Sequence, residues 1–419
     1  MPPKKPKCCH KSLQTRCSLA NKFLFGVFPQ SCESELYKRL MQTFDVAIAG
    51  AGLIGGSIAF ELARAGLRVG VFDAAEPGRE ASWAGAGILS PAPETPAGIP
   101  LVEIAKASMA LYPEFTADVE EVCGHSVGFR PRGTLQAIFS QDAAEELSTV
   151  VALHHGLGLK AEALRVEDAR ELEPALSPEL QAAVLRPDEA SVDNRELTRG
   201  VLEAARKSGA QIVAGRKVKA IWQEGEKCSG LVLDKEKIAA EWTVIAAGCF
   251  SSRIEGAGQY APVRAAKGQM VALRSERVRV ERVLWSDKIY VVPRNDGRIL
   301  AGATVEYVGF DKRVTPGALE KIFAGAIELA PQLADAQVAE TWAGLRPDSP
   351  DHLPILGPTD LGGLLIATGH FRSGILLAPI TAGLIREWAT EQRVSVHWER
   401  FSPMRFQSPA ATEARTAYR

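Results

Sequence analysis

The residues FDVAIAGAGLIGGSIAFELARAGLRVGVFD, numbered 44–73, hold the most informative pattern in this chain. Residues 44–49 form a short apolar run typical of a buried parallel strand, and residues 54–65 have helical periodicity and stop at a glycine. Residues 67–72 predict a second strand, which ends at Asp73. A strand, a glycine turn, a helix, a second strand and an acid in this order predict a βαβ unit that binds a dinucleotide.

Each glycine of the turn has its own predicted role. Gly50 makes the tight turn, Gly52 lets the backbone approach a pyrophosphate, and Gly55 allows the helix to pack closely on the strand. The helix N-terminus then faces the phosphates, and Asp73 accepts hydrogen bonds from a ribose hydroxyl. The predicted cofactor contacts of this unit are Gly50, Gly52, Leu53, Ile54, Gly55, Asp73 and Ala74.

Length and charge limit the class of protein. The chain has 419 residues, which predicts two or three domains with a core of their own. Its formal net charge of -1 gives the whole chain no electrostatic attraction to nucleic acid or to an anionic membrane. No run of 18 apolar residues is present. We therefore expect no nucleic-acid partner and no integral membrane segment.

Residues 1–40 differ in charge from the rest, with eight Lys or Arg against two Glu. Three interpretations stay open for this leader: a targeting peptide, a metal-binding tail, or a disordered segment outside the fold that precedes a true start at Met41. The cysteine spacing does not match paired zinc ligands, and we favour the segment outside the fold.

Cysteine usage points to a reducing compartment, the cytoplasm. Four of the seven cysteines lie in the leader, so few remain for the body of the chain. A disulfide scaffold is therefore not expected there. The remaining cysteines are Cys123, Cys228 and Cys249.

Two further segments favour FAD over NAD. Residues 242–247 (WTVIAA) predict a buried strand that ends before Gly248, and residues 80–91 (EASWAGAGILSP) contain small side chains that can pass close to a cofactor. Both resemble segments of FAD-dependent amine oxidases. The resemblance implies cofactor contacts at Ala81, Ser82, Ala86, Gly87, Ile88, Ala247 and Gly248, with Val218 on the adenine side.

The C-terminal third carries three motifs in sequence. They are TWAGLRP at 341–347, DHLPILG at 351–357 and GHFRSGILLAP at 369–379. In order and spacing they resemble the glycine oxidases of thiamine biosynthesis, within the D-amino-acid oxidase superfamily. This resemblance extends from about residue 44 to about residue 389.

The resemblance implies an α/β fold with a Rossmann-like FAD-binding domain and a second, mostly antiparallel β substrate domain. We assign residues 41–100, 186–261 and 340–395 to the FAD-binding domain. Residues 101–185 and 262–339 form the predicted substrate domain, and residues 396–419 form a C-terminal tail.

Three side chains are implied to bind the substrate. Arg346 offers a planar fork for bidentate recognition of a carboxylate. Tyr290 can donate to the same carboxylate or cover the site, and Arg372 is implied to line the substrate pocket. Two departures from the resembling enzymes, Ile88 and Val305, leave the preference for glycine over sarcosine or small D-amino acids open.

The loop around Arg372 is implied to contact the flavin through its backbone. It precedes an apolar helix, and a helix N-terminus suits the partly anionic pyrimidine edge of a reduced flavin. The implied contacts are His370, Phe371, Arg372, Ser373, Gly374, Ile375 and Leu376. No cysteine occurs in residues 346–357, where covalently flavinylated relatives carry one, so noncovalent FAD is expected.

The predicted reaction is oxidation of a small amino acid, first of all glycine, to its imine by hydride transfer to FAD, with oxygen as acceptor and peroxide as product. No residue is predicted to act as acid or base, and His370 is not expected to be a general base. Two alternatives stay open: a D-amino acid dehydrogenase that passes electrons to a quinone or carrier, and a non-catalytic flavin-binding protein. A homo-oligomer is also left open.

Overall fold

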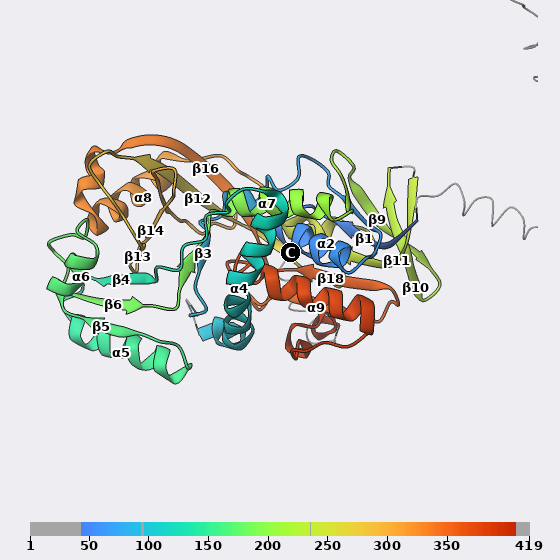
Figure 1. Ribbon diagram of the computed structural model, residues 1–419, viewed down its shortest axis with the longest axis horizontal. Coiled ribbons are helices and arrows are strands. Elements are labelled where there is room, and N and C mark those ends of the chain that lie inside the picture. Colours follow the sequence, from blue (N-terminus) through green and yellow to red (C-terminus); the bar gives the residue numbers. More distant parts are fainter. Residues whose placement is uncertain (1–42, 94–95, 235, 408–419) are drawn as a thin grey trace, which may run out of the picture. The chain divides into compact units, whose positions relative to one another are not determined.

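The computed structural model describes residues 43–93, 96–234 and 236–407 (Figure 1). The leader predicted over residues 1–40 lies outside this part of the chain, as do the last twelve residues of the predicted tail. Within the described residues no helix combines the length and the apolar character that a membrane crossing requires.

The predicted βαβ unit is present at the start of the described chain. The strands β1 (Thr43–Ala49) and β2 (Val69–Phe72) pair in parallel, with Val46 beside Val69, and α2 (Leu53–Arg64) connects them. Both strands are almost wholly buried, which explains their continuous apolar sequence.

The first sheet is built around this unit in the order β17-β18-β11-β1-β2-β8. Its β18 pairs in parallel with β11, and β8 in parallel with β2, so the centre of the sheet is parallel. A hairpin of β9 and β10 continues β11. The added strands are β8 (Gln211–Val213), β9 (Val218–Glu224), β10 (Lys227–Leu233), β11 (Glu236–Ile245), β17 (Ile355–Pro358) and β18 (Leu364–Thr368).

Three helices pack with α2 beside this sheet: α4 (Val102–Cys123), α7 (Asn194–Lys207) and α9 (Ala378–Glu391). The helix α2 contacts both α7 and α9, and α4 lies side by side with α9 (Figure 1). The sequence assigned residues 101–185 to the second domain. In the structure α4, which lies within that range, packs with the helices beside the first sheet instead. Its Ile104 and Tyr112 are buried in the same core as Ile58 of α2.

The second sheet is mostly antiparallel, as expected, in the order β16-β12-β15-β14-β13-β4-β6-β5. Only the pair of β13 with β4 is parallel among the pairings of its described strands. The strands are β4 (Thr134–Ile138), β5 (Glu162–Leu164), β6 (Ala182–Arg186), β12 (Arg264–Arg274), β13 (Val283–Trp285), β14 (Tyr290–Pro293), β15 (Arg298–Gly302) and β16 (Gln337–Asp348).

Smaller elements complete the described chain. Helices α5 (Ala143–Gly156), α6 (Val166–Leu172) and α8 (Pro316–Leu329) accompany the second sheet. The short helix α3 (Ala81–Ala84) contacts α7 and β16, and the strand β3 (Ile88–Leu89) pairs with β7 (Ala190–Ser191). The 3-10 turns are η1 (Pro96–Leu101), η2 (Gly248–Arg253), η3 (Pro331–Asp335), η4 (Glu399–Phe401) and η5 (Pro403–Phe406).

The structure adds detail to the sequence assignments. Residues 134–138 form the strand β4, and Arg130 makes an isolated bridge to Ser191. The strand β16 belongs to the second sheet, although residues 340–348 were assigned to the FAD-binding domain. The predicted tail packs through buried Trp398 and Phe406. The two-domain division itself stays a prediction, since the chain from Phe44 onward forms one compact unit.

We expect Gly55→Ala to destabilise the protein. A Cβ at this position would lie 2.0 Å from the carbonyl oxygen of Gly50, so helix and turn would have to separate. Overpacking of this kind costs about 1–3 kcal/mol. Urea unfolding followed by circular dichroism measures the change.

The matched control is Gly156→Ala, in exposed α5, where an added Cβ meets nothing within 4 Å. It should leave the free energy of unfolding equal or raise it by up to about 1 kcal/mol, because alanine is the better helix former. Equal unfolding midpoints for the two variants would contradict the predicted packing role of Gly55.

Candidate active site

A cavity of about 780 Å³ lies where the carboxyl ends of the first sheet's strands approach the second sheet. This volume is in the range of ligand and cofactor pockets. All residues predicted from the sequence to contact cofactor or substrate line it, except Gly55. Gly55 instead packs against the turn at Gly50, which agrees with its expected packing role.

The glycine turn forms one wall of the cavity. Gly50 has φ +103°, and a Cβ there would lie 2.5 Å from the carbonyl oxygen of Ala246, so only glycine fits. The backbone N–H of Ala51 donates to Asp73 Oδ2 at 2.8 Å, and that of Leu53 donates to Ser82 Oγ at 2.9 Å. These bonds fix the turn in position before any ligand arrives.

One end of the cavity is marked by Asp73. The Asp73 carbonyl accepts from the Arg216 N–H at 2.7 Å, which brings Lys217 and Val218 to the same wall. In a βαβ unit of this kind the acid after the second strand binds a ribose. Adenosine therefore fits at this end, and the reactive ring of a flavin fits at the other.

The Arg294 side chain hydrogen-bonds to the backbone of the small-residue segment 81–88. The Arg294 guanidinium is buried and donates to the carbonyl oxygen of Ala86 at 2.7 Å and to Asn194 Oδ1 at 2.8 Å. The Asn194 amide donates in turn to the carbonyl of Ser82 at 2.7 Å. Burial lowers the pKa of Arg294 to about 10, which the nearby Asp193 carboxylate partly offsets.

The strand β16 is tied to the same segment. Trp342 Nε1 donates to the carbonyl oxygen of Ala84 at 2.9 Å, and the Arg195 guanidinium lies 3.7 Å from the Trp83 ring centroid and 4.6 Å from that of Trp342. A Cβ at Gly344 would lie 2.2 Å from Ala84 Cβ. The backbones therefore approach closely, two residues before Arg346.

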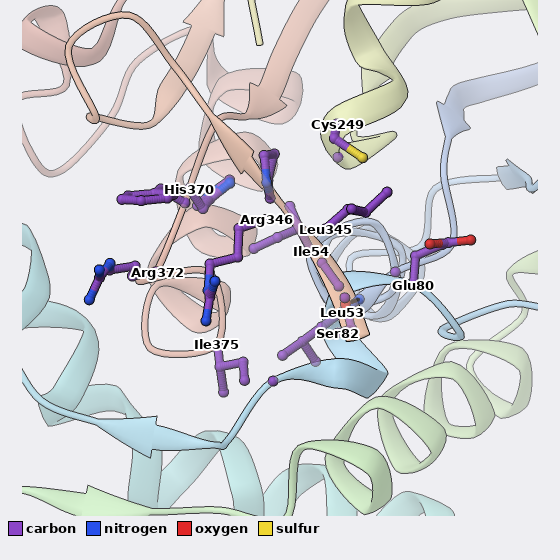
Figure 2. A pocket seen from close by; sticks show the side chains of 18 of the residues that line it. Leu53, Ile54, Glu80, Ser82, Cys249, Leu345, Arg346, His370, Arg372 and Ile375 are labelled. Atoms are coloured by element: carbon purple, nitrogen blue, oxygen red, sulfur yellow. Dashed lines mark hydrogen bonds between the residues drawn. The ribbon is translucent and has the colours of Figure 1, made fainter. Parts of the chain in front are cut away.

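Arg346 reaches the cavity across the backbone of β12. Its Nη1 donates to the carbonyl oxygen of Thr304 at 3.1 Å, and a Cβ at Gly268 would lie 2.3 Å from that nitrogen. In Figure 2 Arg346 and Arg372 lie on one side of the pocket, and Glu80 and Cys249 lie on the other. The sequence GQM at 268–270 thus leaves room for a guanidinium to lie flat.

Tyr290 is at the start of β14, near Arg346. Its hydroxyl is 3.5 Å from Met270 Sδ, and its ring centroid is 5.5 Å from that of Trp285. Burial raises the pKa of Tyr290, and the positive charge of Arg346 opposes this more weakly. The phenol therefore stays protonated at neutral pH and can donate a hydrogen bond.

The loop of residues 370–377, which we call the cofactor loop, closes the cavity between β18 and α9. The Phe371 N–H donates to the carbonyl of Pro347 at 3.0 Å, which joins this loop to the end of β16. His370 is buried, its Nε2 is 3.1 Å from Thr381 Oγ1, and burial lowers its pKa to about 3. Burial also lowers the pKa of Arg372.

Sequence reasoning missed several residues of the cavity wall. The missed side chains include Met270, Trp285, Tyr307 and His352. His352 Nδ1 lies 2.6 Å from Asp348 Oδ1, and the Tyr307 hydroxyl donates to the other oxygen of that carboxylate at 2.8 Å. Met270, Trp285 and Tyr307 lie outside the quoted motifs, whereas His352 belongs to DHLPILG at 351–357 but was assigned no role. The polar Asp348 at the end of a buried strand is a signal that could have been used.

Comparison with known proteins agrees with the geometry. The chain is 35% identical over 376 residues to the bifunctional protein ThiO/ThiG of Trichormus variabilis, covering 88% of this chain. It is 34% identical over 350 residues to the glycine oxidase of Pseudomonas aeruginosa, covering 82% of this chain and 93% of that protein. The crystal structure of glycine oxidase from Geobacillus kaustophilus superposes with a TM-score of 0.81 at 32% identity, covering 87% of this chain and 99% of that one.

The chain spans only about half of the bifunctional relative, 56% of its length. The model of the FAD dependent oxidoreductase family matches residues 45–388, which is more than half of this chain. The glycine turn, the cavity and the motifs at its wall all lie within that match, and this chain therefore belongs to the FAD dependent oxidoreductase family.

Proposed function

We propose that this protein oxidises glycine to its imine with oxygen as electron acceptor, forming hydrogen peroxide, and ammonia and the 2-oxo acid after hydrolysis. Sarcosine and small D-amino acids are further candidate substrates. The names of the relatives, glycine oxidase and ThiO/ThiG, support glycine and a supply of iminoacetate for the thiazole of thiamine.

The observation that carries this proposal is the position of Arg346. Its guanidinium is held by the Thr304 carbonyl over Gly268, on the side of the pocket away from Glu80 and Cys249 (Figure 2). A planar guanidinium binds a carboxylate through two parallel hydrogen bonds. The protonated hydroxyl of Tyr290 can donate to the same carboxylate, so an amino acid would be fixed at its carboxyl group.

The same cavity fits FAD. We assign the glycine turn to the pyrophosphate, Asp73 to the ribose and Val218 to the adenine side, because these lie together at one end. The isoalloxazine would lie between residues 86–88 and the cofactor loop. When bound, FAD accepts a hydride from the substrate Cα.

We further propose that FAD binds without a covalent bond. Cys249 lines the cavity, but burial raises the pKa of its thiol to about 12. The thiol is therefore protonated at neutral pH, and the thiol form is the poor nucleophile. The reactivity needed for covalent attachment is absent at this position.

Oxidation by hydride transfer needs orientation of the substrate more than a protein base. The side chains near Tyr290, those of Ile88, Met270 and Trp285, are mostly apolar. This lining disfavours a charged or strongly polar side chain on the substrate. The second sheet, which contributes Met270, Trp285, Tyr290 and Arg346, would form the substrate domain.

A panel of amines tests the reaction directly. Glycine should consume oxygen and release peroxide with the highest kcat/KM, compared with sarcosine, D-alanine and D-proline. An artificial electron acceptor under anaerobic conditions is assayed in parallel. Turnover of glycine only with the artificial acceptor would exclude the oxidase and leave a dehydrogenase.

Arg346→Ala should raise KM for glycine about 100-fold while FAD absorbance stays unchanged. Two charge-assisted hydrogen bonds, each contributing about 1.5–3 kcal/mol, correspond to about 100-fold at the lower end of that range. Steady-state kinetics and the flavin spectrum measure both quantities.

Two further variants sharpen that test. Gly268→Ala keeps the charge but displaces the guanidinium, so a smaller rise in KM is expected. Arg274→Ala removes an arginine from the same strand as Gly268, about half-exposed, and should leave KM unchanged. Loss of FAD from Arg346→Ala would mean that Arg346 binds the cofactor instead.

The neutral state of His370 predicts a pH effect on stability. The pKa of His370 in the folded protein is about 3, below the ordinary 6.5. As the pH falls, the unfolded chain therefore protonates this imidazole at a higher pH than the folded protein does. The contribution of neutral His370 to the free energy of unfolding is complete above pH 6.5 and is lost as the pH falls toward 3. Relative to His370→Gln, the wild-type protein should lose about 2 kcal/mol more between pH 7 and pH 5.

Urea unfolding at a series of pH values measures this difference. His397→Gln is the control for replacing a histidine at the surface, because that side chain is 99% exposed. If His370→Gln follows the wild-type curve, then the folded and unfolded chains bind this proton equally well, and burial does not hold His370 neutral.

A further inference from the structure

We propose that Tyr112 and Ser108 of α4 are positioning residues that aim a backbone amide of the cofactor loop at the pyrimidine edge of the flavin. The proposal rests on FAD binding in the cavity and is independent of which amine is oxidised. Neither residue lines the cavity, so each would act through the loop.

Both hydroxyls bond directly to carbonyl oxygens of this loop. The Ser108 hydroxyl donates to the Leu376 carbonyl at 2.6 Å, and the Tyr112 hydroxyl donates to the Ile375 carbonyl at 2.5 Å. Both side chains have no exposed surface. The bonds span more than 260 residues of sequence, and they form because α4 packs beside α9, which follows the loop.

Because a peptide group is planar, the hydrogen bond from Tyr112 to the Ile375 carbonyl also fixes the direction of the N–H in the same peptide group. The Ile375 carbonyl and the Leu376 N–H belong to one peptide group, and in a trans peptide they point in opposite directions. Since the carbonyl points at Tyr112, the Leu376 N–H points away from α4. Ile375 and Leu376 both line the cavity, and Ile375 is seen at its edge in Figure 2.

This amide is available to a ligand. Among the residues that the structure describes, the Leu376 N–H has no hydrogen-bond acceptor, whereas the next amide, that of Leu377, donates to the Ser373 carbonyl at 2.9 Å. A buried donor without a partner costs free energy, so a ligand acceptor at this point is favoured. The flavin pyrimidine offers carbonyl oxygens there.

The consequence is electrostatic. A preorganised N–H near the first turn of α9 stabilises negative charge, which increases on the pyrimidine ring when the flavin is reduced. Tyr112 would therefore raise the reduction potential of the flavin. Ser108 would have a smaller effect. The Leu376 carbonyl that it bonds shares a peptide group with the Leu377 N–H, which already donates to the Ser373 carbonyl.

The test uses Tyr112→Phe and Ser108→Ala in the FAD-loaded protein. Tyr112→Phe keeps the ring that stacks on Phe129 at 5.9 Å and removes only the hydroxyl. The matched control is Thr116→Val, on the same helix and buried, whose hydroxyl bonds to the carbonyl of Tyr112 inside α4. Sulfite is the probe, because it adds to flavin in proportion to the stability of negative charge and needs no amine substrate.

We expect Tyr112→Phe to raise the dissociation constant for sulfite about tenfold, the effect of one well-placed hydrogen bond. The midpoint potential should become about 30 mV more negative for a two-electron couple. Ser108→Ala should change both less, and Thr116→Val should change neither. Equal values for Tyr112→Phe and Thr116→Val, or a lower Tm without a change in potential, would overturn the proposal. If Tyr112→Phe does not fold, an unchanged potential in Ser108→Ala overturns it, and a partial shift supports it.

Discussion

The close contact of β16 with the segment 81–88 is the constraint on which the site depends. Gly344 lies so near Ala84 that no side chain fits between them, and Trp342 donates to the Ala84 carbonyl from the same strand. This contact joins the second sheet to the segment that follows the βαβ unit. Arg346, two residues further along β16, is thereby placed at the same cavity as the glycine turn.

The buried Arg294 makes this arrangement rigid. Removing a guanidinium from water is unfavourable, and the lowered pKa of about 10 reflects that cost. Hydrogen bonds to Ala86 and Asn194 and the Asp193 carboxylate at 3.5 Å compensate it. A buried charge with these partners has one favourable position, so the backbone of the cavity wall is fixed with it. Such preorganisation is what orientation of a substrate against a cofactor requires.

The local parts of this fold could be predicted from sequence, and the long-range parts could not. The βαβ unit follows from periodicity and glycine spacing, because it is determined by neighbouring residues. The Arg294 contacts with Asn194 join positions 100 residues apart. The position of α4 was missed for the same reason, since its apolar face is equally compatible with either sheet and only tertiary packing selects one.

The site residues divide in the same way. The motif residues Arg346 and Arg372 belong to recognisable strings, so the resemblance identified them as candidates. Met270 lines the same cavity outside these motifs, and His352 lines it as a motif residue to which no role was assigned. They reach it because β12 pairs along β16 and because the chain turns back after Asp348. A sequence motif therefore indicates the chemistry, while the pairing of strands determines which other side chains surround it.

Two arginines contribute positive charge at the proposed substrate end, while the Asp348 carboxylate lies behind His352 and Tyr307 of the same wall. Arg346 and Arg372 are permanently cationic, His370 is kept neutral by burial, and Tyr290 stays protonated. The positive groups attract a carboxylate and also favour negative charge on a reduced flavin beside them. Protonating His370 would add a third positive charge, but its burial makes that state unfavourable. The same burial that keeps His370 neutral therefore also sets the electrostatic balance here, and under the proposed function the two arginines would favour both binding of a substrate carboxylate and negative charge on the reduced flavin.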